Sequence, residues 1–424
     1  MLFRAIRSAT SAQLNMRGMT KPVTTLIHHP YQPPAGFAAP QPGVFKASTV
    51  IFPNVAAMRA RDWKHKNGYT YGLHGTPTTF LLEERIAALE GGRQCILVPS
   101  GLAAIANVNL ALLSTGDEVL LPDNVYGPSK ALAEGELKNW GITYQLYDPM
   151  DPADLEARIG PRTRLVWLEA PGSVTMEFGP VAHFADICRR RGITTALDNT
   201  WGAGLAFNGF DFGHGERRTA GSGADIVVHA LTKYPSGGGD VLMGSVVTRD
   251  EALHLKLKLA HMRLGWGVAA NDAEAVLRSL PSLAVRYRAH DQAARHLARW
   301  LQGRPEIAQV LHPALEGSPG HAHWKAMCGP DGLAAGLFSV VFDPRYASAQ
   351  VDAFCDALRL FKLGYSWGGP VSLVVPYDVP SMRSAALGGW KHQGVLVRFS
   401  IGLEDAGDLQ ADLEQALAAL HRPG

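Results

Sequence analysis

A lysine that could act as a nucleophile follows a short apolar stretch in the middle of the chain. Residues 226–231 are largely apolar and partly β-branched, which predicts a buried strand, and the glycine-rich segment after Lys233 cannot continue a strand or a helix. Lys233 is therefore expected at a strand end, where a partly desolvated amine can lose its proton and attack a carbonyl carbon. Most lysines are solvated surface charges, so this interpretation depends on what else the chain supplies.

Two further groups occupy similar positions after predicted strands. Ser100, Gly101 and Leu102 join the apolar stretch Cys95–Val98 to a helical pattern, so backbone N–H groups and the positive helix end can bind a phosphate. A Ser-Gly pair before a helix is equally an ordinary N-cap. Asp198 follows the apolar stretch Thr194–Leu197, at the strand edge where open α/β sheets bind ligands.

An anion site, a carboxylate and a lysine, each at the end of a predicted parallel strand, together match one cofactor. Pyridoxal phosphate has a phosphate to anchor, a ring nitrogen that a carboxylate keeps protonated, and an aldehyde that condenses with a lysine. Tyr126, after the predicted strand Glu118–Leu121, is placed to stack on such a ring. A tyrosine in a Tyr-Gly-Pro turn also fits plain packing.

The elements that must position these groups alternate along the chain. Strand patterns at Cys95–Val98, Glu118–Leu121, Leu165–Leu168, Thr194–Leu197 and Ile226–His229 alternate with helical ones, which predicts an α/β fold with a mostly parallel sheet in a large domain, residues 63–280. Long helices and alternating strands predict a smaller α+β domain, residues 281–424. Residues 1–62 are predicted to form an N-terminal extension and a proline-rich arm that contacts a neighbouring subunit.

Composition excludes several classes of function. A formal net charge of +2 gives no general attraction to nucleic acid or to a membrane, and four widely spaced cysteines favour neither zinc nor disulfides and fit the reducing cytoplasm. Residues 1–20 are basic and hydroxylated, which fits a targeting segment or a miscalled start. His312, His321 and His323 lie in a Pro- and Gly-rich stretch and are expected to be surface histidines, not metal ligands.

Several ordered motifs between about residues 22 and 421 carry a resemblance to a known family. They are Tyr71–Thr78, Ser100–Leu102, Tyr126, Glu169–Glu177, Asp198–Trp201, Thr232–Tyr234, Tyr365–Gly369 and Arg398. With these motifs the sequence resembles the Cys/Met-metabolism family of pyridoxal-phosphate enzymes. The resemblance implies pyridoxal-phosphate fold type I, like that of aspartate aminotransferase, and a homotetramer built as a dimer of dimers with shared active sites.

The same resemblance implies a role for each site residue. Lys233 holds the cofactor covalently, Asp198 pairs with the pyridine nitrogen, and Tyr126 stacks on the ring and assists proton transfer. Arg398 clamps the substrate α-carboxylate, beside Tyr365, Ser366 and Trp367. Tyr71 contributes to catalysis and to phosphate binding from the adjacent subunit. The expected phosphate ligands within the chain are Ser100, Gly101, Leu102 and Thr232.

The sequence departs from the family pattern in four places. Leu73 and Ala230 stand where the family has an arginine and a serine that bind phosphate. Gly237–Asp240 replaces the usual Gly-His-Ser-Asp after the lysine. The segment Gly213–Gly223 looks like a loop insertion, and no role is predicted for it.

The resemblance implies a carbon–sulfur lyase of methionine biosynthesis. Relatives that act at Cγ carry a sequence similar to Glu-Ser-Leu-Gly-Gly where this chain has Tyr365–Gly369, so Tyr365 and Trp367 are expected to make the pocket narrower and less anionic. The predicted reaction is β-elimination of L-cystathionine to homocysteine, pyruvate and ammonia. The alternatives are γ-elimination or γ-replacement, a cofactor-binding regulator that acts through a protein partner, and, more remotely, a nicotinamide oxidoreductase.

Overall fold

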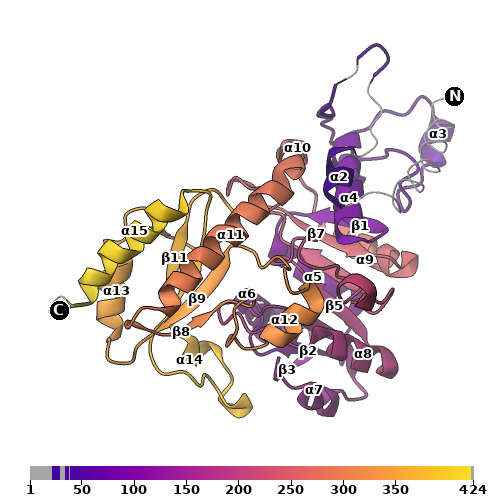
Figure 1. The fold of residues 1–424 in the computed structure, drawn as a ribbon. Helices are drawn as coiled ribbons and strands as arrows, with labels where there is room; N and C mark the ends of the chain where they lie inside the picture. The colour runs from indigo at the N-terminus through magenta and orange to yellow at the C-terminus, as the bar shows by residue number, and fades with distance from the viewer. Residues whose placement is uncertain (1–21, 29–33, 38, 422–424) are drawn as a thin grey trace.

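The structure is a computed structural model that describes residues 22–28, 34–37 and 39–421, in which two β-sheets lie side by side (Figure 1). The possible targeting segment, residues 1–20, lies outside the described residues. Within the predicted arm, the structure has two short helices, α2 (Pro22–Ile27) and α3 (Val55–Arg59). The predicted boundaries at residues 62 and 280 stay predictions.

The first sheet has seven strands in the order β1-β7-β6-β5-β4-β2-β3. Six strands are parallel, and only β7 runs antiparallel to its neighbours β1 and β6. The five strands predicted from the sequence are confirmed, whereas β3 and β7 were not predicted. The strands are β1 (Gln94–Val98), β2 (Glu118–Pro122), β3 (Thr143–Tyr147), β4 (Thr163–Glu169), β5 (Thr194–Asp198), β6 (Ile226–His229) and β7 (Gly244–Thr248).

Helices cover both faces of this sheet, as expected for near-continuous apolar strands. Helices α4 and α8 pack on one face, and α5 and α9 pack on the other. Alternate residues of each strand therefore enter two separate apolar clusters; Leu97 lies in one cluster and Val98 in the other. The helices of this part are α4 (Pro77–Glu90), α5 (Gly101–Leu112), α6 (Gly127–Leu132), α7 (Pro152–Arg158), α8 (Val181–Arg191), α9 (Glu251–Leu264) and α10 (Ala270–Ser279).

The second sheet has five strands in the order β10-β11-β12-β9-β8 and is mostly antiparallel. Helices α11, α13 and α15 pack on one of its faces (Figure 1). The alternating residues Val397, Phe399 and Ile401 share the face turned to these helices. The elements are α11 (Leu283–Gln302), β8 (Ile307–Leu311), α12 (His321–Cys328), β9 (Leu337–Phe342), α13 (Ser348–Ala357), β10 (Lys362–Leu363), β11 (Leu373–Tyr377), α14 (Val379–Met382), β12 (Leu396–Ser400) and α15 (Ala406–Leu417).

The expectations for cysteines, membrane contact, metal sites and histidines can be compared with the structure. All four cysteines are buried free thiols. Across the described ranges, no helix is long and apolar enough to cross a bilayer, and no cluster of His, Cys, Asp or Glu could hold a metal ion. The expectation for His312 was wrong: it is fully buried, because residues 312–318 fold back and the Ser318 hydroxyl accepts a hydrogen bond from the His312 backbone N–H at 2.7 Å.

Candidate active site

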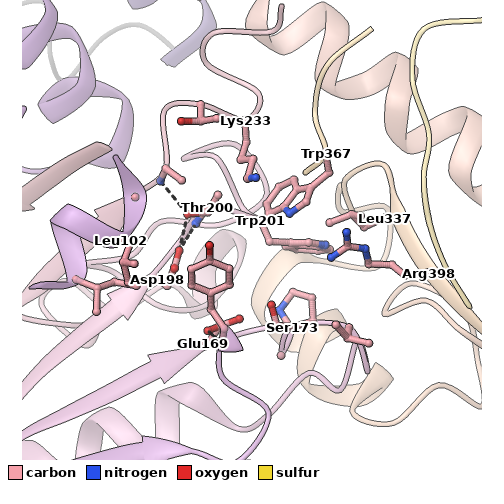
Figure 2. A pocket seen from close by; sticks show the side chains of 18 of the residues that line it. Leu102, Glu169, Ser173, Asp198, Thr200, Trp201, Lys233, Leu337, Trp367 and Arg398 are labelled. Atoms are coloured by element: carbon pink, nitrogen blue, oxygen red, sulfur yellow. Dashed lines mark hydrogen bonds between the residues drawn. The ribbon is translucent and has the colours of Figure 1, made fainter. Parts of the chain in front are cut away.

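A cavity of about 190 Å³ lies at the carboxyl ends of the parallel strands, where the second sheet meets the first (Figure 2). Strands β1, β5 and β6 run in the same direction, so the residues that follow them meet at this edge. The predicted site residues that line the cavity are Ser100, Gly101, Leu102, Tyr126, Asp198, Thr232, Lys233, Trp367 and Arg398.

The Lys233 amine projects into the cavity from the turn after β6 (Figure 2). It donates a hydrogen bond to the Ser366 hydroxyl at 2.8 Å and lies 5.3 Å from the centre of the Trp367 ring. Burial, together with the nearby charge of Arg398, lowers the pKa of Lys233 to about 8, although Asp198 acts in the opposite direction. A substantial fraction of this amine is therefore neutral near physiological pH.

Asp198 lies at the end of β5, and Thr200 holds its carboxylate. The Thr200 backbone N–H and hydroxyl both donate to Oδ1, at 2.9 and 2.5 Å, and the same hydroxyl accepts a hydrogen bond from the Ala230 N–H (Figure 2). Burial raises the pKa of Asp198, and these hydrogen bonds, His229 and Lys233 oppose the rise. Because both bonds from Thr200 go to Oδ1, Oδ2 remains for a ligand in the cavity.

Glu169 is a second carboxylate in the cavity, and its role was not predicted from the sequence. It ends β4 directly opposite Asp198 in the β4–β5 register and accepts a hydrogen bond from the Tyr126 backbone N–H at 2.9 Å. Burial and the charge of Asp198 raise the pKa of Glu169 well above its usual range, which favours its neutral form. The strand-end reasoning that singled out Asp198 applies equally to Glu169. Other lining residues, to which the sequence analysis assigned no role, include Ser173, Val174, Met176, Thr200, Trp201 and Leu337.

Arg398 brings a cation to the cavity from the second sheet. It is in the middle of β12 and is buried, with its guanidinium 5.3 Å from the centre of the Tyr377 ring. Its Nε atom is buried and has no hydrogen-bond partner within the described part of the chain. A buried donor of this kind indicates a missing acceptor, and a carboxylate suits the planar guanidinium.

Ser100, Gly101 and Leu102 begin helix α5 at the cavity wall. The Ser100 hydroxyl caps the helix by accepting a hydrogen bond from the Ala103 N–H at 3.1 Å. A Cβ atom at Gly101 would lie only 2.6 Å from the Cβ of Ala230, so Gly101 lets the helix start approach the end of β6. The Thr232 hydroxyl contacts the backbone of Met243.

Three predicted residues do not line this cavity. Ser366 is not a lining residue, but its hydroxyl accepts a hydrogen bond from the Lys233 amine. Tyr365 points to solvent and is 81% exposed, so the expectation that it narrows the pocket was wrong for this chain conformation. Ser366, between Tyr365 and Trp367, has a φ of 114°. This turn lets Trp367 face the cavity while Tyr365 faces solvent. Tyr71 is 46% exposed and lines a different hollow together with Leu73.

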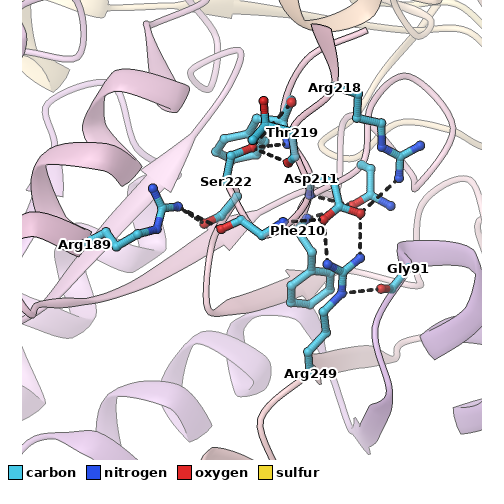
Figure 3. Close-up of polar contacts among 12 residues, drawn as sticks. Gly91, Arg189, Phe210, Asp211, Arg218, Thr219, Ser222 and Arg249 are labelled. Carbon is cyan, nitrogen blue, oxygen red and sulfur yellow. Dashed lines mark hydrogen bonds and ion pairs between the residues drawn. The ribbon is translucent and has the colours of Figure 1, made fainter. Parts of the chain in front are cut away.

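The insertion-like segment Gly213–Gly223 lies away from the cavity. It folds around Asp211, whose carboxylate accepts hydrogen bonds from the Gly221 N–H and the Arg249 guanidinium (Figure 3). Arg218 forms a longer ion pair with the same carboxylate, at 3.3 Å. The segment is therefore held by a local ion-pair network that shares no residue with the cavity lining.

Comparison with known proteins agrees with this geometry. Residues 23–418 match the family described as Cys/Met metabolism PLP-dependent enzyme. A putative cystathionine beta-lyase of Rhizobium johnstonii is 41% identical over 89% of this chain and 91% of its own length. The cystathionine beta-lyase of Salmonella typhimurium is 36% identical over 88% and 92%. The solved structure of metB from Corynebacterium glutamicum matches with a TM-score of 0.81 and 29% identity, over 96% of this chain and all of the other.

The chain belongs to the Cys/Met-metabolism family of pyridoxal-phosphate-dependent enzymes. Its fold is pyridoxal-phosphate fold type I, as predicted. The residues of the cavity fit the family cofactor on three counts. Lys233 offers a partly neutral amine, Asp198 keeps one carboxylate oxygen for a ring nitrogen, and the start of α5 offers backbone donors where Gly101 keeps the wall open.

Proposed function

We propose that this enzyme is a carbon–sulfur lyase of methionine biosynthesis that cleaves L-cystathionine at the Cβ–S bond. One molecule of cystathionine and one of water yield homocysteine, pyruvate and ammonia. The observation that carries the proposal is the position of Lys233, whose largely desolvated amine shares one cavity with the buried guanidinium of Arg398 and the carboxylate of Asp198. The names of the two relatives above support the choice of substrate.

Each wall of the cavity has a separate binding task in this proposal. Lys233 holds the cofactor covalently, Asp198 faces its ring nitrogen, and Tyr126 lies against its ring. The phosphate is held by Ser100, Gly101, Leu102 and Thr232. Arg398 binds the substrate α-carboxylate, because its unsatisfied Nε atom completes a bidentate contact there. When bound, pyridoxal phosphate supplies the electron sink that makes the Cα proton acidic.

Lys233 also serves as the base in this proposal. With a substrate bound, the free Lys233 amine would remove the Cα proton; in this structure its pKa of about 8 leaves part of it unprotonated at neutral pH. The Ser366 hydroxyl, 2.8 Å away, keeps the amine directed at the cavity. Tyr126 is the second proton-transfer group, and burial together with Asp198 raises its pKa, which keeps the phenol protonated and able to donate to a departing thiolate.

The lining near Lys233 favours β- over γ-elimination. A γ-elimination needs an additional proton shift at Cβ, and a second base beyond Lys233 assists it. On this side the cavity is closed by the Trp367 ring, which offers no acceptor for a proton. The carboxylates among the described lining residues, Asp198 and Glu169, both lie at the sheet edge.

Product identity tests the proposed reaction. Purified holoenzyme and L-cystathionine, under single-turnover conditions, should give pyruvate and homocysteine in equal amounts, resolved by mass spectrometry. Cystine and similar β-thioethers should react more slowly. Cysteine with 2-oxobutyrate as main products would assign γ-elimination instead. Bound cofactor with no keto acid from any thioether would favour the regulator, and binding of NAD without pyridoxal phosphate would favour an oxidoreductase.

We also propose a homotetramer, as a dimer of dimers, located in the cytoplasm. The exposed Tyr71 lies outside the cavity of its own chain, which supports a role in the active site of a neighbour. Exposed apolar residues of the arm, among them Ile51 at 86% exposure, supply a surface for the same contact. Four buried free thiols are consistent with a reducing compartment.

Mixing two inactive variants tests the shared site. Tyr71→Phe and Lys233→Ala chains, unfolded and refolded together, should regain up to about a quarter of wild-type activity, because half of randomly mixed dimers are hybrids and each hybrid has one intact site. Each variant refolded alone is the control. Native mass spectrometry must confirm mixed oligomers, and mixed oligomers without recovered activity would show that each site is built from one chain.

A further inference from the structure

The cavity wall formed by residues 171–176 has an unusual backbone conformation. Val174 and Met176 have φ values of 68° and 55°, in the left-handed region. For a β-branched residue such as Val174 this is a strained conformation, which persists only when surrounding contacts hold it. Strain of this kind is concentrated at functional sites, so the contacts that hold this wall affect the shape of the substrate cavity.

Glu177 directly follows the strained wall and holds it through hydrogen bonds. Its Oε2 atom accepts hydrogen bonds from the Thr175 hydroxyl at 2.9 Å and from the Asn124 side-chain amide at 3.0 Å. Its backbone carbonyl accepts one from the Gly172 N–H, which closes the loop on itself. The Ser173 N–H donates to the carbonyl of Asn124 and so ties the wall to the segment after β2.

Arg383 connects this loop to the second sheet. It follows α14, in the connection between β11 and β12, and its side chain is only 9% exposed. Its guanidinium donates to Glu177 Oε2 at 2.7 Å and to Asp123 Oδ2 at 2.8 Å, so one side chain bridges two carboxylates. Two cations, Arg383 and Lys130, face two anions, and the cluster is close to neutral.

Asp123 also holds the connection between β11 and β12 through contacts that do not involve Arg383. It accepts hydrogen bonds from the Lys130 amine and from the Ser384 backbone N–H, both at 3.0 Å. Lys130 in turn donates to the Met382 carbonyl at 2.7 Å. Residues 382–384 are therefore fixed to the end of β2 by backbone contacts on both sides of Arg383.

The wall also contacts the strand pair that carries Arg398. The Ser339 hydroxyl donates to the Val174 carbonyl at 2.5 Å, and Ser339 is the direct cross-strand partner of Arg398. The strained wall is thus held on one side by Arg383 and Glu177 and on the other by β9. A shift of the wall changes the space between Arg398 and the cofactor-binding edge of the first sheet.

We propose that Arg383 is a positioning residue that fixes the wall 171–176 and thereby the place of the substrate carboxylate against Arg398. The inference takes the identity of the substrate from the proposed function, whereas the contacts of Arg383 come from the structure itself. Arg383 does not line the cavity and contacts no cofactor-binding residue, so its effect should fall on substrate binding and not on cofactor binding.

The test compares Arg383→Gln with a matched control, Arg249→Gln. Arg249 forms a similar two-bond contact with Asp211, at 2.6 and 2.7 Å, but lies away from the cavity (Figure 3). For Arg383→Gln holoenzyme we expect KM for L-cystathionine to rise about 10- to 100-fold with a smaller change in kcat, because a misplaced anchor costs up to about 100-fold. The visible absorbance of the bound cofactor should stay at the wild-type level. Arg249→Gln should keep the wild-type KM.

A second readout separates this inference from the proposed reaction. The Kd for L-alanine, which has the α-carboxylate but no leaving group, is measured from the shift of the cofactor absorbance. It should rise in Arg383→Gln by about the same factor as KM. If wild-type enzyme binds L-alanine but leaves cystathionine intact, the proposed reaction fails and the comparison of Kd values still tests Arg383.

Equal KM and Kd values in Arg383→Gln and wild type would overturn the proposal, as would an equal rise in the Arg249→Gln control. If Arg383→Gln does not fold, Arg383→Lys is used, which keeps the cation but loses the rigid guanidinium fork that bonds both carboxylates. That variant should show a smaller rise of KM in the same direction. Unchanged KM and Kd in Arg383→Lys would likewise overturn the proposal.

Discussion

Replacing Lys233 with alanine should abolish turnover, by about 10⁴-fold or more, and should remove the visible absorbance of the lysine-bound cofactor. The amine is the covalent anchor and the base in the proposed reaction, so its removal affects both binding and proton transfer. The fold should survive, because burial already disfavours the ammonium and the side chain makes one hydrogen bond, to Ser366. Thermal unfolding of the variant and absorbance after cofactor addition are the measurements.

Lys258→Ala is the matched control for this substitution. Lys258 is also buried, with burial lowering its pKa, but it lines a separate hollow between α4 and α9. The Lys258→Ala variant should keep its cofactor and its turnover. Turnover in Lys233→Ala would refute the assigned role.

The pKa of Lys233 also predicts how cofactor binding depends on pH. In wild-type apoprotein, the rate of covalent cofactor capture should rise about tenfold per pH unit below pH 8 and level off above it, since only the neutral amine attacks and the pKa of Lys233 is about 8.

The part of the site that lies at the edge of the first sheet could be predicted from the sequence, because its residues all follow parallel strands. Parallel strands end at the same edge, so Ser100, Asp198 and Lys233 could be brought together without knowing the strand order. Glu169 follows from the same rule and was overlooked. Strand β7 was not predicted, because it begins with Gly244 shortly after the glycine-rich segment Gly237–Asp240. Its antiparallel insertion leaves the direction of β1 and β6 unchanged.

The half of the site that comes from the second sheet could not be predicted from local patterns. Arg398 lies within an alternating strand, where an arginine is ordinarily solvated, and only the family resemblance gave it a role. Its burial arises when the second sheet packs over the edge of the first, which is a tertiary event. Tyr365 and Trp367 differ in exposure because of the turn at Ser366, and no spacing rule gives that φ value.

Asp198→Asn should retain part of its cofactor and lose about 10³-fold in rate. The amide keeps an oxygen for the two Thr200 hydrogen bonds, so the end of β5 should keep its shape. However, the amide carries no negative charge and presents an N–H₂ group to the ring nitrogen, so nothing stabilises the protonated form of that nitrogen. An unprotonated ring is a weak electron sink. The measurements are single-turnover rate and the equilibrium constant for cofactor binding.

The matched control is Asp225→Asn, because Asp225 makes nearly the same pair of contacts at the opposite end of the sheet. It precedes β6, and its carboxylate accepts hydrogen bonds from the Thr195 backbone N–H and hydroxyl at 2.8 and 3.0 Å. Asp225 is exposed, so Asp225→Asn controls for the change in these two hydrogen bonds and not for burial, and it should keep the wild-type rate. If the two variants lose rate equally, or if Asp198→Asn turns over near normally, Asp198 is a structural residue and the ring nitrogen has another partner. A loss confined to Asp198→Asn assigns the effect to the charge that faces the cavity, since each carboxylate accepts hydrogen bonds from a threonine N–H and hydroxyl.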